Sequence, residues 1–235
     1  MPEVTLAIFQ FCFPIAAYFR SSLTTMPNIS SDQIFTWIER FAAHIAEQKD
    51  YLTQLDAAIG DADHGANMHR GLQAVLAKKA ELQNSDIGAM LKGVAMTLIS
   101  TVGGASGALY GTFFLQASTL AGGRTELSPS EFGSVLEKGL AGIVLRGKAA
   151  LGDKTMIDAL QPAIKAYKLS IDSDETLEQA LSKAVIAAEE GLKSTVPLVA
   201  RKGRASYLGE RSAGHPDPGA TSTLILFRSA AETLG

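Results

Sequence analysis

Apolar side chains recur every three or four positions along most of the chain, which is the spacing that places them on one face of an α-helix. The first such stretch follows Ser30, which forms a capping-box signature with Gln33. Its apolar stripe consists of Ile34, Trp37, Ile38, Phe41 and Ile45. This pattern predicts the first amphipathic helix of the fold.

Further stripes of the same kind predict further helices, several with recognisable start signals. Ser85 is expected to cap one of them, and Ser128, Pro129 and Glu131 together mark the start of another. Glycines and prolines exclude a regular helix from 203–218. The predicted segments are a short turn at 51–55 and helices at 67–79, 85–101, 103 through 115, 128–146, 155–169 with a kink at Pro162, Asp174 or Thr176 to 200 with a bend at Pro197, and 219–233.

These segments amount to about eight helices. No run alternates between apolar and polar residues for long enough to predict a strand, so the sequence predicts an all-α domain. Periodicity alone does not distinguish a closed helical barrel from another bundle.

Composition narrows the class of protein. The 235 residues are 46% hydrophobic and 19% charged, which is typical of one soluble globular domain rather than of a disordered chain. A net charge of −3 argues against a broad basic face for nucleic acid, although Arg201, Lys202 and Arg204 form a small cluster that is either solvated or meets a phosphate. The single cysteine, Cys12, excludes an internal disulfide and fits a reducing cytoplasm.

Residues 5–19 form a mostly apolar run that is too short for a comfortable transmembrane helix. The residues before this run lack positive charge and no small-residue cleavage site follows it, which argues against a signal peptide. The sequence therefore predicts no membrane association.

The strongest chemical signal is the stretch 56–70, which reads D-A-A-I-G-D-A-D-H-G-A-N-M-H-R. It places Asp56, Asp61 and Asp63 within eight residues, and Gly60 allows a sharp turn between them. Carboxylates this closely spaced suit a hard cation such as Mg²⁺, which also prefers phosphate oxygens. A helix start follows directly and attracts anions, so the stretch suits a metal and phosphate site. From these residues alone, a solvated turn with an Asp N-cap is the simpler alternative.

A second loop, G-G-A-S-G at 103–107, has the form of a glycine-rich turn that opens a helix. Its backbone N–H groups can approach a phosphate closely, and the Ser106 hydroxyl can donate as well. Close helix packing would explain these glycines equally well. The loop is not a P-loop, because no G-K-[ST] follows it.

Two further loops carry candidate residues. The segment from Arg146 to Met156 is either a helix end followed by the next helix or part of a binding site, and a phosphate contact by Lys154 is the less favoured alternative. The segment 203–220 is long and polar for a compact domain, which is typical of a functional lid or of a disordered loop.

Several strings in these loops together resemble one family. They are I-G-D-A-D-H-G-A-N-M at 59–68, G-G-A-S-G at 103–107, G-R-A-S-Y-L-G-E-R at 203–211 and D-P-G-A at 217–220, with Ala108 where the family commonly has proline. With these strings in the same order, residues 26–235 resemble the ADP-binding L subunits of phosphotransferase-system-dependent dihydroxyacetone kinases.

The resemblance implies a fold and a set of contacts. The fold is an antiparallel eight-helix barrel whose interhelical loops hold the nucleotide at one end. Asp56, Asp61 and Asp63 are expected to bind two Mg²⁺ ions that bridge the nucleotide phosphates. Nucleotide contacts are expected from His64, Gly65, Ala66, Asn67, Ala105, Ser106, Gly147, Met156, Arg204, Asp217, Pro218 and Gly219.

The resemblance also implies a reaction and partners. Bound ADP would remain as a coenzyme, accept phosphate from a phosphohistidine on an M subunit and, as ATP, phosphorylate dihydroxyacetone held on a K subunit. No residue of this chain is assigned as a catalytic nucleophile, and a homodimer is a further possibility. Such a subunit is an enzyme only together with its partners and lies in the cytoplasm.

Two alternatives stay open. The chain could be the separate nucleotide domain of an ATP-dependent triose or ketose kinase, or a nucleotide-binding module that regulates another protein without catalysis. Because a resembling subunit would begin near Met26, residues 1–25 are predicted to be an N-terminal extension outside the fold, and residues 26–235 the nucleotide-binding L domain.

Overall fold

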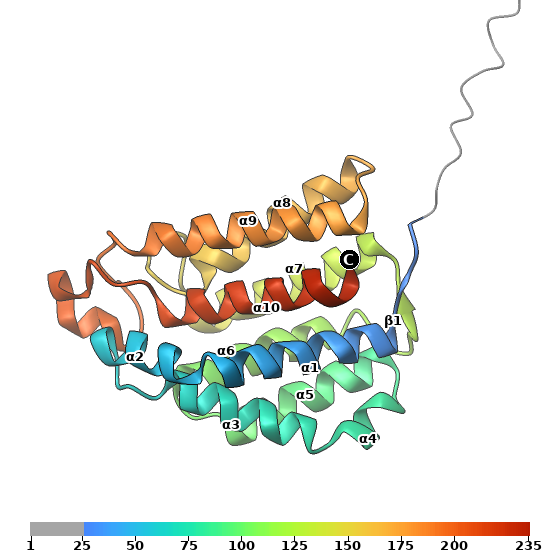
Figure 1. Cartoon of the computed structure of the whole chain (residues 1–235), viewed down its shortest axis with the longest axis horizontal. Helices are drawn as coiled ribbons and strands as arrows, with labels where there is room; N and C mark the ends of the chain where they lie inside the picture. The colour runs from blue at the N-terminus through green and yellow to red at the C-terminus, as the bar shows by residue number, and fades with distance from the viewer. Residues whose placement is uncertain (1–25) are drawn as a thin grey trace, which may run out of the picture.

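Helices make up most of residues 26–235, which a computed structural model describes (Figure 1). The all-α class predicted from the sequence is confirmed, and the predicted extension at 1–25 lies outside the described residues. No helix of the described part is long and apolar enough to cross a membrane. The elements are β1 (Ile29–Ser30), α1 (Ser31–Glu47), α2 (Lys49–Ile59), α3 (His64–Leu76), α4 (Lys79–Gln83), α5 (Ile87–Thr101), α6 (Gly104–Ser118), β2 (Glu126–Leu127), α7 (Pro129–Gly147), α8 (Ile157–Asp172), α9 (Leu177–Thr195), the 3₁₀ helix η1 (Arg204–Ser212) and α10 (Pro218–Leu234).

Local capping signals begin several helices as predicted. Ser30 and Gln33 form the capping box that starts α1. Ser128 and Glu131 form the one that starts α7. Thr176, one of the two predicted starts of α9, caps that helix in the same way. These side chains satisfy backbone N–H groups that the first helical turn leaves free, which fixes where the chain enters each helix.

Other boundaries in the first half of the chain differ from the prediction. Asp86, not Ser85, caps α5, because its carboxylate accepts a hydrogen bond from the Ala89 N–H at 3.0 Å. The helix α2 stands where only a short turn was predicted at 51–55. The sequence did not predict a longer helix because Asp56, which is buried, interrupts the apolar stripe of α2. Helix α3 begins three residues earlier than predicted, for a reason that lies in the candidate site.

The second half shows similar differences. Helix α8 begins two residues later than predicted and contains Pro162, whereas α9 ends at Thr195, before Pro197, which has no N–H group to continue the helix. The stretch expected to be free of helix contains η1, which is interrupted at Gly209 with φ of 53°. The antiparallel pair of β1 and β2 was not predicted, because strands of two residues are too short to show alternation.

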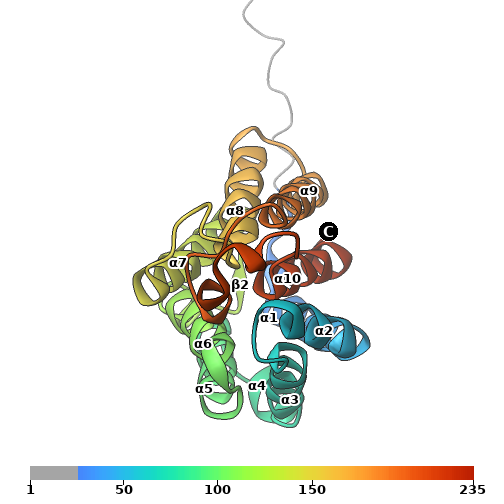
Figure 2. The ribbon, with the colours of Figure 1, turned by 90° about the vertical axis from the view of Figure 1, so that its left-hand side faces the viewer.

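Within the described residues, eight helices contact one another in a closed order. Helix α1 packs on α3 and α3 on α5, and the contacts continue through α6, α7, α8 and α9 to α10, which returns to α1. Figure 2 shows these helices end-on. Additional contacts join α3 to α6 and α8 to α10. This arrangement is consistent with the barrel that the resemblance implies.

Aromatic residues join helices across the interior. Trp37 of α1 packs edge-on against Phe132 of α7, with 5.5 Å between ring centroids, and Phe132 packs in the same way against Tyr167 of α8 at 5.8 Å. The Trp37 Nε1–H donates to the backbone carbonyl of Leu226 in α10 at 3.0 Å. The hydrogen bond joins the first helix to the last, and the aromatic contacts join α1 to α7 and α7 to α8 across the interior. Together they help to keep the ring of helices closed.

Four connections meet at one end of the helices: α2 to α3, α5 to α6, α7 to α8, and the long connection from α9 to α10 that contains η1. This end lies on the left in Figure 1 and faces the viewer in Figure 2. The fold therefore brings together all the loops that carry candidate residues.

Candidate functional site

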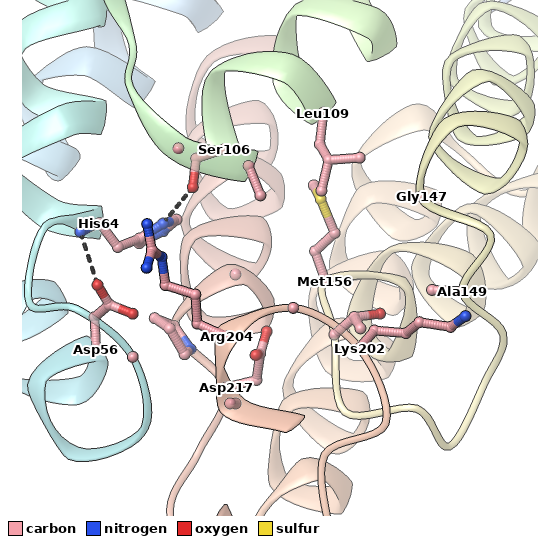
Figure 3. A pocket seen from close by; sticks show the side chains of 18 of the residues that line it. Asp56, His64, Ser106, Leu109, Gly147, Ala149, Met156, Lys202, Arg204 and Asp217 are labelled. Atoms are coloured by element: carbon pink, nitrogen blue, oxygen red, sulfur yellow. Dashed lines mark hydrogen bonds between the residues drawn. The ribbon is translucent and has the colours of Figure 1, made fainter. Parts of the chain in front are cut away.

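These four loops enclose a cavity of about 370 Å³ (Figure 3). Its volume lies in the range of small-molecule sites. Most residues selected from the sequence line it, namely Asp56, Asp61, Asp63, His64, Ala105, Ser106, Gly147, Met156, Arg204, Asp217, Pro218 and Gly219.

Three other expected contact residues lie beside the cavity rather than in its wall. Gly65 packs so closely on α2 that an added Cβ would lie 2.0 Å from the Lys49 carbonyl oxygen. Ala66 is exposed, and the side-chain oxygen of the buried Asn67 accepts a hydrogen bond from Arg70 Nη2 at 2.6 Å. Gly65 thus has a packing role, since a larger residue would separate α2 from α3.

Asp56, Asp61 and Asp63 converge at one wall of the cavity. One carboxylate oxygen from each lies within 4.8 Å of those of the other two. Burial, followed by the neighbouring charge of Asp61, raises the pKa of Asp63. Because like charges this close repel, the cluster suits a divalent cation, and carboxylate oxygens are ligands that Mg²⁺ accepts.

Asp56 also holds the start of α3. Its Oδ2 accepts hydrogen bonds from the backbone N–H groups of Asp63 at 2.8 Å and His64 at 3.1 Å, whereas the Asp63 side chain makes no capping bond. This explains why α3 begins at His64. Gly60 leaves room for the carboxylate, since an added Cβ would lie 2.1 Å from Asp56 Oδ1.

His64 is buried between two hydroxyl groups. Its Nδ1 lies 2.8 Å from Ser106 Oγ, as Figure 3 shows, and its Nε2 lies 3.0 Å from Ser222 Oγ. Ser222 Oγ in turn lies 2.8 Å from the Tyr110 hydroxyl. Burial lowers the pKa of His64 to about 4, so its ring is neutral at pH 7. Ser222 and Tyr110 were not among the residues selected from the sequence.

Two basic side chains from the lid, which we define as residues 196–217, reach the cavity. Arg204 Nε lies 2.8 Å from Asp61 Oδ2, although the Arg204 side chain is 64% exposed. Lys202 also lines the cavity and was not among the expected contacts. Positive charge beside the acidic cluster is suited to binding phosphate groups.

Lys154 ties the two ends of the lid together. Its side chain is buried, and its ammonium group donates to the carbonyl oxygens of Thr195 at 2.6 Å, His215 at 2.5 Å and, more weakly, Val196 at 3.4 Å. Burial lowers the pKa of Lys154. All the hydrogen bonds that this group makes go to backbone carbonyls, so its geometry supports a structural role rather than the phosphate contact considered from the sequence.

An apolar wall faces the acidic one. Leu109, Ile143 and Met156 line it. Figure 3 shows Leu109 and Met156 on the side of the cavity away from Asp56 and His64. A ligand with one charged end and one flat apolar end fits a cavity with these two walls.

Comparison with known proteins decides the family. A family model described as the DAK2 domain matches residues 58–232, most of the chain. The chain belongs to the DAK2 domain family. This DAK2 chain is 44% identical over 204 residues to the "PEP-dependent dihydroxyacetone kinase, ADP-binding subunit DhaL" of Escherichia coli K12, an alignment that covers 87% of the chain and 97% of the relative. It is 43% identical to the ADP-binding subunit DhaL of PEP-dependent dihydroxyacetone kinase 1 of Listeria innocua, over 86% of the chain and 96% of the relative.

A solved structure shares the fold. It is the dihydroxyacetone kinase of C. freundii in complex with AMP-PNP and Mg²⁺, which matches with a TM-score of 0.66 at 24% identity. The match covers 99% of the DAK2 chain and 38% of that kinase, so the chain spans well under half of its length.

We expect Asp56→Ala to destabilise the DAK2 chain even without metal. The substitution leaves two backbone N–H groups of α3 without their acceptor, at a cost of about 1–3 kcal/mol. Asp63→Asn is the matched control, because it removes a repelling charge but no capping bond and should leave the free energy of unfolding equal or slightly higher. Urea denaturation in the presence of EDTA measures both variants, and equal losses would contradict the capping role.

We expect Lys154→Met to loosen the lid. Without the ammonium group, the carbonyls at both ends of the lid lose their common donor, so trypsin should cleave faster after Arg201, Lys202 and Arg204. The exposed Lys165→Met in α8 serves as the control. Limited proteolysis followed by mass spectrometry gives the rates, and a Lys154→Met rate equal to that of the unaltered chain would contradict the clamp.

We expect Asp217 to make stability depend on pH. Burial raises the pKa of this carboxyl group, which caps α10, from 3.8 to about 7. The folded chain therefore keeps a proton that the unfolded chain releases, and the Asp217 contribution to the free energy of unfolding falls as the pH rises through this interval. Asp217→Asn, which keeps a capping oxygen, should exceed the unaltered chain in stability at pH 8 and approach it near pH 5. Urea denaturation showing a constant difference across this range would rule out the shift.

Proposed function

We propose that this chain is the nucleotide-binding subunit of a dihydroxyacetone kinase. Bound ADP accepts a phosphoryl group from a phosphohistidine on a donor subunit, and the resulting ATP phosphorylates dihydroxyacetone held on a separate subunit. The observation that carries the proposal is a cavity that combines an acidic wall, two basic side chains of the lid and an apolar wall, in a chain that is 44% identical to an ADP-binding subunit along 97% of that subunit's length.

In this proposal each wall of the cavity contacts a different part of the nucleotide. The acidic wall faces the phosphates, and Arg204 and Lys202 of the lid supply positive charge to them. Met156 and Leu109 pack against the adenine, where an apolar wall excludes water from the ring. Pro218 and Gly219, at the start of α10, also line the cavity and would approach the nucleoside.

Asp56, Asp61 and Asp63 are the residues that would hold magnesium, with two ions as the expected number. Mg²⁺ held there would neutralise negative charge on the phosphates and on the transferred group. Without a cation the three carboxylates would repel the phosphates. They also repel one another, since, in addition to burial, the charges of Asp61 and Asp56 raise the pKa of Asp63.

The cavity holds one histidine, and its chemistry supports dependence on partner subunits. Both ring nitrogens of His64 are engaged, one by Ser106 and one by Ser222. A histidine held in this way is not free to carry a phosphoryl group or to bind a triose. The phosphohistidine and the triose site therefore belong to other subunits in this proposal.

Lid contacts support slow release of the nucleotide. Arg204 connects the lid to Asp61 across the cavity, and Lys154 anchors the lid at both of its ends. A coenzyme that is rephosphorylated in place must dissociate slowly compared with each transfer step. A lid anchored in this manner meets that requirement.

The decisive experiment is to identify the nucleotide that the purified native protein retains after extensive desalting. Acid extraction and chromatography should give stoichiometric ADP, and metal analysis should give about two Mg²⁺ per chain. Mixing with candidate donor and triose-binding subunits should then yield dihydroxyacetone phosphate. An empty site that exchanges ATP at every turnover would indicate a separate domain of an ATP-dependent kinase, and nucleotide binding without transfer would indicate a regulatory module.

We expect Asp61→Asn to abolish detectable binding of Mg²⁺ and ADP together while leaving the helical content unchanged. The substitution removes one metal ligand and only one exposed ion pair, with Arg204. Asp50→Asn is the matched control, because Asp50 lies on α2 with 87% of its side chain exposed. Isothermal titration and circular dichroism measure the two properties, and unchanged ADP affinity in Asp61→Asn would overturn the ligand assignment.

A further inference from the structure

A chain of four side chains leads from the buried core to the cavity. Its members are Tyr110, Ser222, His64 and Ser106, and successive polar atoms are 2.8, 3.0 and 2.8 Å apart. Tyr110 and Ser222 are at most 1% exposed and His64 is 6% exposed. His64 and Ser106 belong to the predicted contacts, whereas Tyr110 and Ser222 do not. We call this set the hydroxyl chain.

Each member has one proton to donate in a hydrogen bond. The acceptors near each donor therefore decide whether donation runs from Tyr110 toward Ser106 or the opposite way, which we call the direction of the hydroxyl chain. Tyr110 has two acceptors within reach, Ser222 Oγ at 2.8 Å and Thr223 Oγ1 at 3.4 Å, and the shorter contact is the stronger one. Tyr110 therefore donates to Ser222.

The Ser222 hydroxyl then needs an acceptor for its own proton. Its alternatives are His64 Nε2 at 3.0 Å and the Gly219 carbonyl oxygen, also at 3.0 Å. That carbonyl already accepts the Thr223 hydroxyl at 2.9 Å and is also the acceptor for an α-helical N–H group four residues on. Because a carbonyl oxygen has two lone pairs, the open acceptor is the ring nitrogen.

His64 consequently carries its single proton on Nδ1 and donates it to Ser106 Oγ. The Ser106 proton is then left without an internal acceptor and can point into the cavity. In the opposite direction, Ser106 would donate to His64 and present only lone pairs to a cavity whose wall already holds three carboxylates.

We propose that Ser222 and Tyr110 are positioning residues that direct the hydroxyl chain toward the cavity, so that Ser106 donates a hydrogen bond to a phosphate oxygen of the bound nucleotide. Four aligned donors polarise one another, which strengthens the last bond in a site of low dielectric constant. This inference rests on the proposed function for the identity of the anion. It adds two buried residues, Ser222, which lies outside the cavity wall, and Tyr110, which lines the cavity next to Ser106 and His64.

The first test reads the tautomer of His64 directly. Two-bond ¹H–¹⁵N spectra of the nucleotide-free full chain, with the His64 signal assigned from a His64→Gln variant, should show the proton on Nδ1. A signal from the Nε2-protonated ring as the main form would overturn the direction of the hydroxyl chain. This result does not depend on phosphoryl transfer, so it is separable from failure of the proposed function.

The second test is a double-mutant cycle on nucleotide affinity. Ser106→Ala and Ser222→Ala should each weaken binding of ADP with Mg²⁺ by roughly threefold to tenfold, the value of one hydrogen bond. Ser222→Ala should cost nothing further in the Ser106→Ala background, because both changes break the same chain. Additive losses, or an unchanged ADP affinity in Ser222→Ala, would overturn the proposal.

Two controls separate positioning from general damage to the fold. Ser229→Ala removes another buried serine of α10 whose Oγ lies 3.1 Å from a different histidine, His44, and should leave ADP affinity unchanged. Ser222→Thr keeps the hydroxyl and should restore affinity. Adenosine, which lacks phosphate, should bind Ser222→Ala and the unaltered chain equally; a matching loss for adenosine would mean that Ser222 acts only on packing, which would overturn the proposal.

Discussion

Three carboxylates held within 4.8 Å of one another create a repulsion that the surrounding structure has to contain. Asp56 shows how this is done, because two of its hydrogen bonds bind it to the first turn of α3. The same turn is drawn against α2 through Gly65, where no Cβ would fit. The acidic cluster is therefore part of the contact between α2 and α3, which we call the joint. The fold positions its charges without the help of a bound cation.

The cavity depends on this joint and on three others. Helices that contact in a closed order place their connections at common ends, so the loops at 60–63, 102–103 and 148–156 and the lid meet although they are far apart in sequence. One wall then carries charge and the other is apolar. This division of one small space accounts for how a cavity to which no catalytic nucleophile is assigned can still serve phosphoryl transfer, since it has to hold and orient a nucleotide rather than react itself.

Sequence reasoning succeeded where the signal was local. Ser30 and Ser128 cap helices together with residues three positions on, so their helix starts could be read directly. The start of α3 could not, because its cap is Asp56, seven residues before the helix N-cap. Most residues selected through strings that resemble a known family line the cavity. Ser222 and Tyr110 were missed because they are 112 residues apart and stand at helix positions that resemble ordinary core.

The anchoring of the lid by Lys154 has a consequence for how such proteins diversify. Because the carbonyls of Thr195 and His215 share one donor, both ends of the intervening segment are fixed at a single point of the scaffold. The entropic cost of closing such a loop increases only slowly with the number of residues in it. Insertions, deletions and substitutions between these two residues can therefore accumulate without moving the helices, provided that Lys202 and Arg204 still reach the cavity. The outward surface of the lid can then change while the lining of the cavity beneath it is kept.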